Sequence, residues 1–266
     1  TLWSWGNNGY GNLGTGNVNT YYSPKQIGAL TTWSKVAAGN GHSLAIKTDG
    51  TLWAWGNGNQ GQLGNNTLNQ YSSPVQIGAL TNWLSVTASG YSGNSSASVK
   101  TDGTLWTWGL NNVGQLGDNS VSNRSTPVSV AGAIKTFCSV SGGSAYAVAL
   151  DKYGRAWGWG YNFYGSLGDN TVVSKSTPVS VLGAVKTFCS IVSGVGFTVA
   201  LDKYGRAWGW GQNLYGNLGN NSVVSYSTPV SVLGAIKTFC KIRVAGGSVI
   251  ALDQYGRAWA WGFNTS

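Results

Sequence analysis

Glutamate and methionine are absent from this 266-residue chain, and histidine occurs once, as His42. Catalytic triads, paired carboxylates for acid–base chemistry and multi-histidine metal sites require more of these residue types than the chain contains. His42 falls where Tyr146 and Phe197 stand in later copies of a repeated segment, which favours a role as an aromatic-sized filler. We therefore predict no catalytic residues, no metal site and no cofactor.

Long apolar runs are also missing. No stretch of about eighteen apolar residues occurs, so the sequence predicts no membrane-spanning helix. The chain does not begin with Met and has no signal-peptide pattern, and we expect a processed or excised piece whose targeting sequence is gone. Charged residues make up only 9%, against roughly a quarter in ordinary proteins. The even spread of aromatic and β-branched residues nevertheless argues against disorder.

The few charges are unequal in sign, because sixteen Lys and Arg against seven Asp give a net charge of +9. This balance favours anionic partners such as nucleic acid, lipopolysaccharide or acidic glycans, although lysines that only solvate loops would produce it too. Lys135, Lys186 and Lys237 each stand in Ala-X-Lys-Thr-Phe-Cys and are expected to form a basic row on adjacent repeats. Nucleic acid is therefore kept as a partner class, but not as the favoured one.

The three cysteines, Cys138, Cys189 and Cys240, are 51 residues apart at one position of successive repeats. Equivalent positions on neighbouring repeats should lie farther apart than the roughly 7 Å between Cα atoms that a disulfide tolerates. We expect buried free thiols, which indicate little about the redox compartment.

Tryptophan and glycine are abundant, with fourteen Trp and 41 Gly. A ten-residue motif, Lys-Thr-Asp-Gly-Thr-Leu-Trp-Ala-Trp-Gly, spans Lys47 to Gly56 and recurs along the chain in two sequence variants, which we call the phrase. Aligning its copies predicts a single domain over 1–266 with five repeats of 50 to 53 residues and a partial sixth. These repeats are 1–50, 51–103, 104–154, 155–205, 206–256 and the partial 257–266.

Each repeat contains four short strand candidates in fixed order, which in the second repeat are 52–55, 74–77, 83–87 and 96–100. A period of about fifty residues with four antiparallel strands and Gly-rich turns is typical of a propeller blade. The predicted fold class is therefore all-β: a β-propeller of about five repeats with four antiparallel strands per blade. An incomplete six- or seven-bladed ring stays open.

The tryptophans of the phrase predict how the blades stack. Trp157 and Trp159 are two residues apart and share one face of a strand, while Ala156 and Gly158 share the other. A large face against a small face lets neighbouring sheets interleave without voids. We therefore expect the tryptophans in the seam between blades.

Tight turns precede the tryptophan strands. Asp49-Gly50 and Asp102-Gly103 match the hairpin signal that needs a positive φ. In the later repeats Asp151 and Arg155 flank a three-residue turn, and the same arrangement recurs twice. These pairs are expected to be exposed cross-strand ion pairs, worth at most ~1 kcal/mol each.

Three segments closely resemble the repeat of the regulator of chromosome condensation (alpha-tubulin suppressor-like) family: Trp-Ala-Trp-Gly-Asn-Gly-Asn-Gln-Gly-Gln-Leu-Gly (53–64), Ser-Ser-Pro-Val (72–75) and Val-Ala-Ala-Gly-Asn-Gly-His-Ser-Leu-Ala-Ile (36–46). The resemblance covers all five repeats and implies a propeller, which in this family is typically seven-bladed. The terse repeats look like those of bacterial and phage-type members, which are often secreted, surface-attached or virion-associated. The eukaryotic namesake's nucleotide exchange depends on an inserted wedge, and nothing resembling that insertion occurs here.

The chain is too short for such a ring. Assigning strands in chain order gives four whole blades between residues 33 and 232, a two-strand piece at 1–28 and a three-strand piece at 239–262. A longer parent chain, a small ring with a redundant end and an end that pairs with another subunit all stay open, and we favour the first. The strand Arg257–Gly262 is accordingly expected to contact further copies or a longer parent chain.

Two loop positions change from blade to blade while the core positions stay constant. One precedes each Pro by three residues, and the other is at the tip of the loop after Trp-Gly, where Gln60 and Val113 stand in two repeats. Tyr and Arg anchor interfaces efficiently, although simple drift of loop residues competes with this interpretation. The predicted binding residues are Tyr10, Tyr21, Tyr71, Arg124, Tyr164, Lys175, Tyr215 and Tyr226.

We expect a non-enzymatic structural, adhesive or receptor-binding propeller of a virion or extracellular assembly, located on the virion surface or outside the cell. It would bind a protein assembly partner or a surface glycan through its blade loops. The alternative is an intracellular interaction propeller of the chromatin or GTPase-regulator type, which the positive net charge favours.

Overall fold

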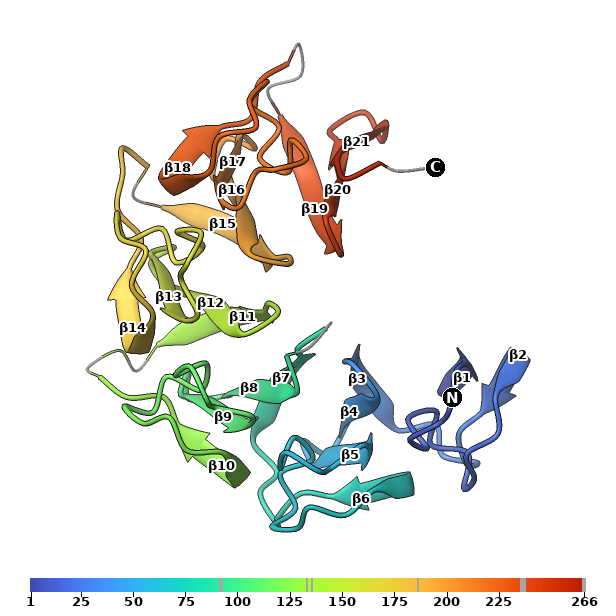
Figure 1. Ribbon diagram of the computed structural model, residues 1–266. Coiled ribbons are helices and arrows are strands. Elements are labelled where there is room, and N and C mark those ends of the chain that lie inside the picture. Colours follow the sequence, from blue (N-terminus) through green and yellow to red (C-terminus); the bar gives the residue numbers. More distant parts are fainter. Residues whose placement is uncertain (91–92, 133, 135, 186, 235–237, 265–266) are drawn as a thin grey trace.

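The structure is a computed structural model that describes residues 1–90, 93–132, 134, 136–185, 187–234 and 238–264. Every regular element in this part of the chain is a β-strand, so it contains no helix that could cross a membrane. The strands form six antiparallel sheets that follow one another round an open arc, with the terminal sheets at its two ends (Figure 1).

Four sheets are complete. The first consists of β3 (Trp33–Ala38), β4 (His42–Lys47), β5 (Leu52–Gly56) and β6 (Tyr71–Gln76). The second consists of β7 (Trp83–Ala88), β8 (Ser95–Lys100), β9 (Leu105–Gly109) and β10 (Arg124–Ser129). The third consists of β11 (Phe137–Gly142), β12 (Tyr146–Asp151), β13 (Ala156–Gly160) and β14 (Lys175–Ser180). The fourth consists of β15 (Phe188–Ser193), β16 (Phe197–Asp202), β17 (Ala207–Gly211) and β18 (Tyr226–Ser231).

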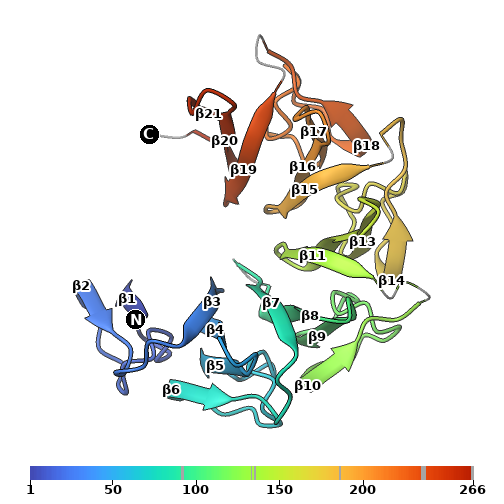
Figure 2. The same ribbon diagram turned by 180° about the vertical axis from the view of Figure 1, so that it is seen from behind.

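Two sheets are partial: β1 (Trp3–Gly6) with β2 (Tyr21–Gln26), and β19 (Phe239–Ala245) with β20 (Ser248–Asp253) and β21 (Ala258–Gly262). Seen from behind, the first strands of the complete sheets lie toward the centre of the arc and the last strands lie at its rim (Figure 2). The all-β propeller prediction is confirmed. The four whole blades and the two- and three-strand end pieces are confirmed as well.

The second tryptophan of each phrase joins one blade to the blade before it. Trp159 is fully buried and packs with Ala97, Val99 and Leu105 of the preceding sheet. Its Nε1 donates a hydrogen bond to the carbonyl of Gln115, at 3.0 Å. The same bond recurs at Trp55, Trp108, Trp210 and Trp261, which donate to Asn12, Gln62, Ser166 and Asn217. The predicted tryptophan seam is confirmed.

A buried asparagine holds four of the five long loops that follow a tryptophan strand, and Gly58 stands at its position in the loop after β5. In the loop 161–174, Asn162 accepts the backbone N–H of Leu167 and donates to the Asp169 carboxylate and the Thr171 carbonyl. Asn170 of the same loop has a left-handed backbone, with φ of 61°, and its N–H donates to Ser227 of the next blade. Asn tolerates this conformation better than most residues. Each loop is therefore fixed internally and also tied to its neighbour.

The Asp–Arg turns differ from the prediction of exposed ion pairs, because the Asp151 side chain is fully buried while Arg155 is 55% exposed. The carboxylate accepts Nε of Arg155 at 2.6 Å, the backbone N–H groups of Tyr153 and Arg155, and Nε1 of Trp157. Burial alone would raise the pKa of Asp151, but these hydrogen bonds outweigh it and hold the pKa below its ordinary value. The arrangement recurs at Asp202 and Asp253.

The expectation of buried thiols is wrong, because Cys138, Cys189 and Cys240 are all exposed and free. Each is the second residue of a first strand, where the pairing with the second strand is irregular, as between Phe137 and Ser139. The irregularity turns the cysteine outward, and Sγ of Cys138 contacts the Asp151 carbonyl at 3.4 Å.

His42 fills the position predicted for it. Its side chain is buried, as are those of Tyr146 and Phe197 at the equivalent position. Nε2 of His42 lies 3.0 Å from Oγ of Ser96 in the next blade. Burial lowers the pKa of His42 to about 4, against a smaller opposing effect of a hydrogen bond with the Asn40 backbone.

Candidate interaction surfaces

The antiparallel sheets give the propeller two faces. One face, the loop face, carries the turns between first and second strands and the long loops between third and fourth strands. The opposite face, the turn face, carries the turns between second and third strands and the connections to the next blade. On the turn face, the N–H of Phe188 donates to Gly154 of the preceding blade, at 2.7 Å. The candidate binding residues therefore divide between two surfaces, with aromatic side chains on the loop face and cationic side chains on the turn face.

The loop tips gather aromatic side chains on the loop face. Tyr164 lies beside Gly196 of the next blade, and its ring meets Phe163 edge-on with centroids 5.1 Å apart. Tyr161 stacks on Phe163 at 6.4 Å, and Tyr215 meets Phe263 edge-on at 4.7 Å. We call these five residues the aromatic patch. Phe163 is 63% exposed and Tyr215 is 57% exposed, so the patch offers apolar area to a partner.

Sequence reasoning found Tyr164 and Tyr215 but missed Tyr161, Phe163 and Phe263. The signal was available, because the loop 161–164 reads Tyr-Asn-Phe-Tyr. Tyr10 is 48% exposed at the same tip position and lies against Gly41. The prediction compared a single tip position in each loop, so it left out the neighbouring aromatic residues that complete the patch.

The residues that precede each Pro by three lie at the base of the loops, where the fourth strands begin, and all are half-buried. Tyr71 and Tyr226 pack against hydrophobic core clusters. The Arg124 Nε pairs with the Asp118 carboxylate at 2.8 Å. Tyr21 accepts a hydrogen bond from Asn17, and Lys175 pairs across the sheet with Gly160. The structure does not gather this set into one surface, and a binding role for it stays a prediction.

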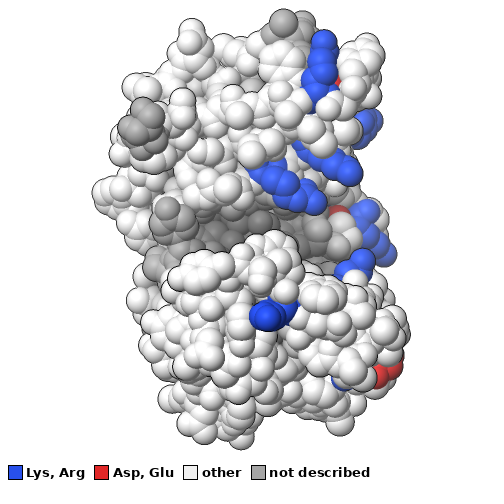
Figure 3. Space-filling view, turned by 90° about the vertical axis from the view of Figure 1, so that its right-hand side faces the viewer, with Lys and Arg blue, Asp and Glu red and all other residues white. Residues whose placement is uncertain are grey.

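Cationic side chains gather on the turn face. Lys152, Arg155, Lys203, Arg206 and Arg257 all stand on the turns between second and third strands, where Asp partners are buried. Figure 3 shows Lys and Arg concentrated along one side of the molecule. The predicted basic row, Lys135, Lys186 and Lys237, lies outside the described residues.

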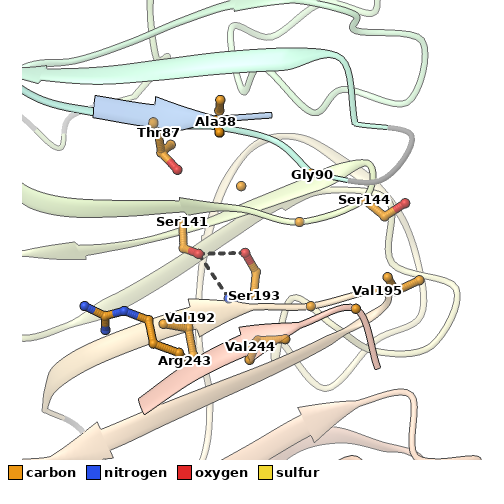
Figure 4. Close-up of a pocket in the computed structure, with 16 residues that line it drawn as sticks. Ala38, Thr87, Gly90, Ser141, Ser144, Val192, Ser193, Val195, Arg243 and Val244 are labelled. Atoms are coloured by element: carbon orange, nitrogen blue, oxygen red, sulfur yellow. Dashed lines mark hydrogen bonds between the residues drawn. The ribbon is translucent and has the colours of Figure 1, made fainter. Parts of the chain in front are cut away.

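The first strands enclose a cavity of about 430 Å³ at the centre of the arc. Small residues line most of it, and Oγ of Ser141 lies 2.8 Å from Oγ of Ser193 across β11 and β15 (Figure 4). Arg243 of β19 is part of the lining, and its guanidinium donates to the Ile242 carbonyl. The lining has hydroxyl and guanidinium groups but no His, Cys, Asp or Glu. Across the described residues, no three such side chains are grouped to hold a metal ion. This cavity is equipped for hydrogen bonding rather than for acid–base chemistry.

The model of the RCC1-like domain family matches residues 1–266. The chain belongs to the RCC1-like domain family. This RCC1-like chain is 30% identical over 273 residues to the mitochondrial RCC1 domain-containing protein RUG3 of Arabidopsis thaliana, covering 98% of this chain and 61% of RUG3. It is 28% identical over 272 residues to the ultraviolet-B receptor UVR8 of the same plant, covering 100% of this chain and 61% of UVR8. The human E3 ubiquitin-protein ligase HERC2 matches at 32% over 179 residues, which cover 64% of this chain and 4% of HERC2.

Solved structures agree on the fold. Human WBSCR16 superposes with a TM-score of 0.86 at 20% identity, covering 98% of the RCC1-like chain and 70% of that structure. Saccharomyces cerevisiae Prp20p superposes at 0.81 with 22% identity, covering 98% and 65%. Yeast RCC1 (Prp20) was solved bound to Kap60, and Prp20p is described with its binding properties to Gsp1p and histones. The chain spans about three-fifths of RUG3 and UVR8.

Proposed function

We propose that this chain is part of a non-enzymatic interaction propeller whose loop face binds a protein partner through the aromatic patch. The observation that carries the proposal is the clustering of exposed rings on loops that buried asparagines hold in place. Rigid aromatic anchors bind with little loss of conformational entropy. The binding of Kap60 by yeast RCC1 supports a protein as the partner class.

We further propose that the partner belongs to an extracellular or virion assembly and that the chain is a bacterial or phage-type member of its family. The terse repeats and the low charge content support this setting. A surface glycan is the second ligand class proposed for the same patch, since exposed aromatic rings offer flat apolar faces. The outer edge of β21, within Arg257–Gly262, pairs with no described strand, and we propose that a further copy or a longer parent chain covers it.

The test compares two triple variants with matched chemistry. Phe163, Tyr164 and Tyr215 are replaced by Ala on the loop face, and the exposed Tyr153, Tyr204 and Tyr255 are replaced by Ala on the turn face. Crosslinking and quantitative mass spectrometry on culture medium, particles and cell lysate should identify a protein lost with the first triple and retained with the second. Glycan arrays probed with the same variants address the second ligand class. Partners that are retained by the loop-face triple, or lost equally with both, would refute the assignment.

An intracellular regulator of the chromatin or GTPase type is the second candidate. The cations on the turn face favour it, as do the binding properties of Prp20p to Gsp1p and histones. Binding to duplex DNA that weakens steeply with added salt, or stimulated nucleotide release from a small GTPase, would support this candidate over the first.

A further inference from the structure

Two equivalent cavities lie in the first two seams of the propeller. One, of about 390 Å³, lies between the sheets β3–β6 and β7–β10, and the other, of about 370 Å³, lies between the sheets β1–β2 and β3–β6. Twelve residues line each cavity, and they occupy the same repeat positions one for one. Volumes of this size accept small organic ligands. The repetition shows that the same residues build the cavity in both of these seams.

A lysine stands between two tryptophans in each cavity. Nζ of Lys100 lies 4.7 Å from the ring centroid of Trp83 and 3.8 Å from that of Trp106. The two rings are 6.3 Å apart and nearly perpendicular, at 83°. Lys47 has the same relation to its two tryptophans, at 5.1 and 3.5 Å. The cation–π contacts hold each ammonium group in a fixed place on the cavity wall.

The ammonium group forms no ion pair within the described part of the chain. Neither Lys100 nor Lys47 takes part in the ion pairs of the described residues. The nearby Asp102 carboxylate accepts hydrogen bonds from Thr104 instead. Lys100 is only 6% exposed, and burial lowers its pKa. The Asp102 carboxylate attracts Lys100 through its charge but forms no ion pair with it. Burying a cation without a contacting anion is unfavourable, so this wall favours an anion.

In the later blades a different residue occupies the repeat position of Lys47 and Lys100, and its charge is paired. Asp151, Asp202 and Asp253 replace the lysine there, and each carboxylate contacts an arginine and Nε1 of a tryptophan. In those blades the chain supplies anion and cation together. In the first two seams the chain supplies the cation and the aromatic walls beside an open cavity, and the carboxylates of Asp49 and Asp102 act on the two lysines through charge without an ion pair.

The remaining wall of the larger cavity has an apolar part and a polar part. Ile77, Pro127 and the half-exposed Leu80 form the apolar part, together with the tryptophans. Among the described residues that line the cavity Lys100 is the only charged one, and the polar part is Asn65, Asn66, Gln76 and Thr126. We propose that the seam cavities bind a carboxylate carried on a flat apolar body, with the carboxylate at Lys100 or Lys47 and the body between tryptophan and the aliphatic wall. A free aryl carboxylate and the C-terminal aromatic residue of a peptide share this chemistry.

The experiment titrates the 266-residue chain with 2-naphthoate and with the neutral 2-naphthylmethanol, by calorimetry and ligand-observed NMR. Naphthoate should bind at both cavities. Lys100→Gln should weaken binding at the larger cavity about tenfold or more, because a charge-assisted contact is lost, and should leave the Lys47 cavity occupied, so that calorimetry counts about half the sites at the original affinity. Lys100→Arg should retain binding, and Lys152→Gln on the exposed turn face should leave it unchanged. Equal affinity for the alcohol, or undiminished naphthoate binding by the Lys47→Gln, Lys100→Gln double variant, would overturn the proposal.

A peptide ending in Phe, compared with its C-terminal amide, identifies the source of the ligand. Binding of the acid but not the amide points to a chain terminus, and binding of naphthoate alone points to a free metabolite-like acid. If Lys100→Gln does not fold, reductive ¹³C-methylation of the unaltered protein gives a second measurement. The dimethyl-Lys100 resonance must then shift on addition of naphthoate, and an unmoved resonance at saturating naphthoate refutes the site.

Discussion

Between pH 7 and pH 4.5, acidification should destabilise this protein mainly through one side chain, His42. The buried imidazole has a pKa of about 4 in the folded state against 6.5 for the ordinary group. Between these values the unfolded chain binds a proton that the folded chain does not, so stability must fall as the pH falls through this window. The difference corresponds to about 3 kcal/mol in total, of which about 2.5 kcal/mol should be lost between pH 7 and pH 4.5.

The assay is equilibrium unfolding in urea, followed by tryptophan fluorescence at several pH values between 7 and 4.5. His42→Phe is the matched control, because Phe197 shows that a phenyl ring fits the equivalent position. Ser96 keeps its hydrogen bond to the Gln62 carbonyl in that variant. The Asp side chains of the unfolded chain titrate near 3.9, below most of this window.

The pH dependence should therefore be nearly absent in His42→Phe. If the unaltered protein and the variant lose the same free energy of unfolding on acidification, the imidazole is not the titrating group. A loss confined to pH values below about 4 would refute the argument in the same way.

Three further outcomes are expected. Trp210→Ala should cost about 3–5 kcal/mol in urea unfolding, since it empties a fully buried seam position, whereas Trp5→Ala in the same chain should cost far less, because Trp5 is 59% exposed; equal costs would contradict the seam. Asn66 has a φ of 62°, so Asn66→Ala should destabilise by about 1 kcal/mol while Asn66→Gly should be nearly neutral; the thermal midpoints of both variants check this, and the reverse order would count against it. All three cysteines are exposed and should react with Ellman's reagent without denaturant; protection in the native state would restore the expectation of buried thiols.

The sequence was sufficient for the architecture because the architecture is repeated. Trp157 and Trp159 recur at a fixed spacing. Because they are two residues apart, one face of the strand carries large side chains and the other carries small ones, and few arrangements of neighbouring sheets can pack such faces. The equivalence of His42 with Tyr146 and Phe197 predicted its burial for the same reason. Repetition turned single residues into patterns that could be checked within one chain.

What the sequence could not give depends on contacts between positions. Asp151 was expected on the surface because it is charged, yet its carboxylate collects donors from three residues of one turn, and only the folded turn brings them together. The outward orientation of Cys138 follows from a local irregularity in strand pairing, and no residue type in the sequence predicts such an irregularity. The aromatic patch draws its residues from loops of three successive sheets, after β13, β17 and β21.

The joints between blades also bear on how such a chain grows. Each joint uses a tryptophan, a loop carbonyl and a positive-φ Asn or Gly, and all the parts that a blade offers to its successor lie within its own repeat. Duplicating one whole repeat in the gene therefore copies a working joint along with the blade. Selection can lengthen or shorten the arc without redesigning its interior. The third, fourth and fifth repeats resemble one another more than they resemble the first two, which is the pattern expected of a protein that has grown in this way.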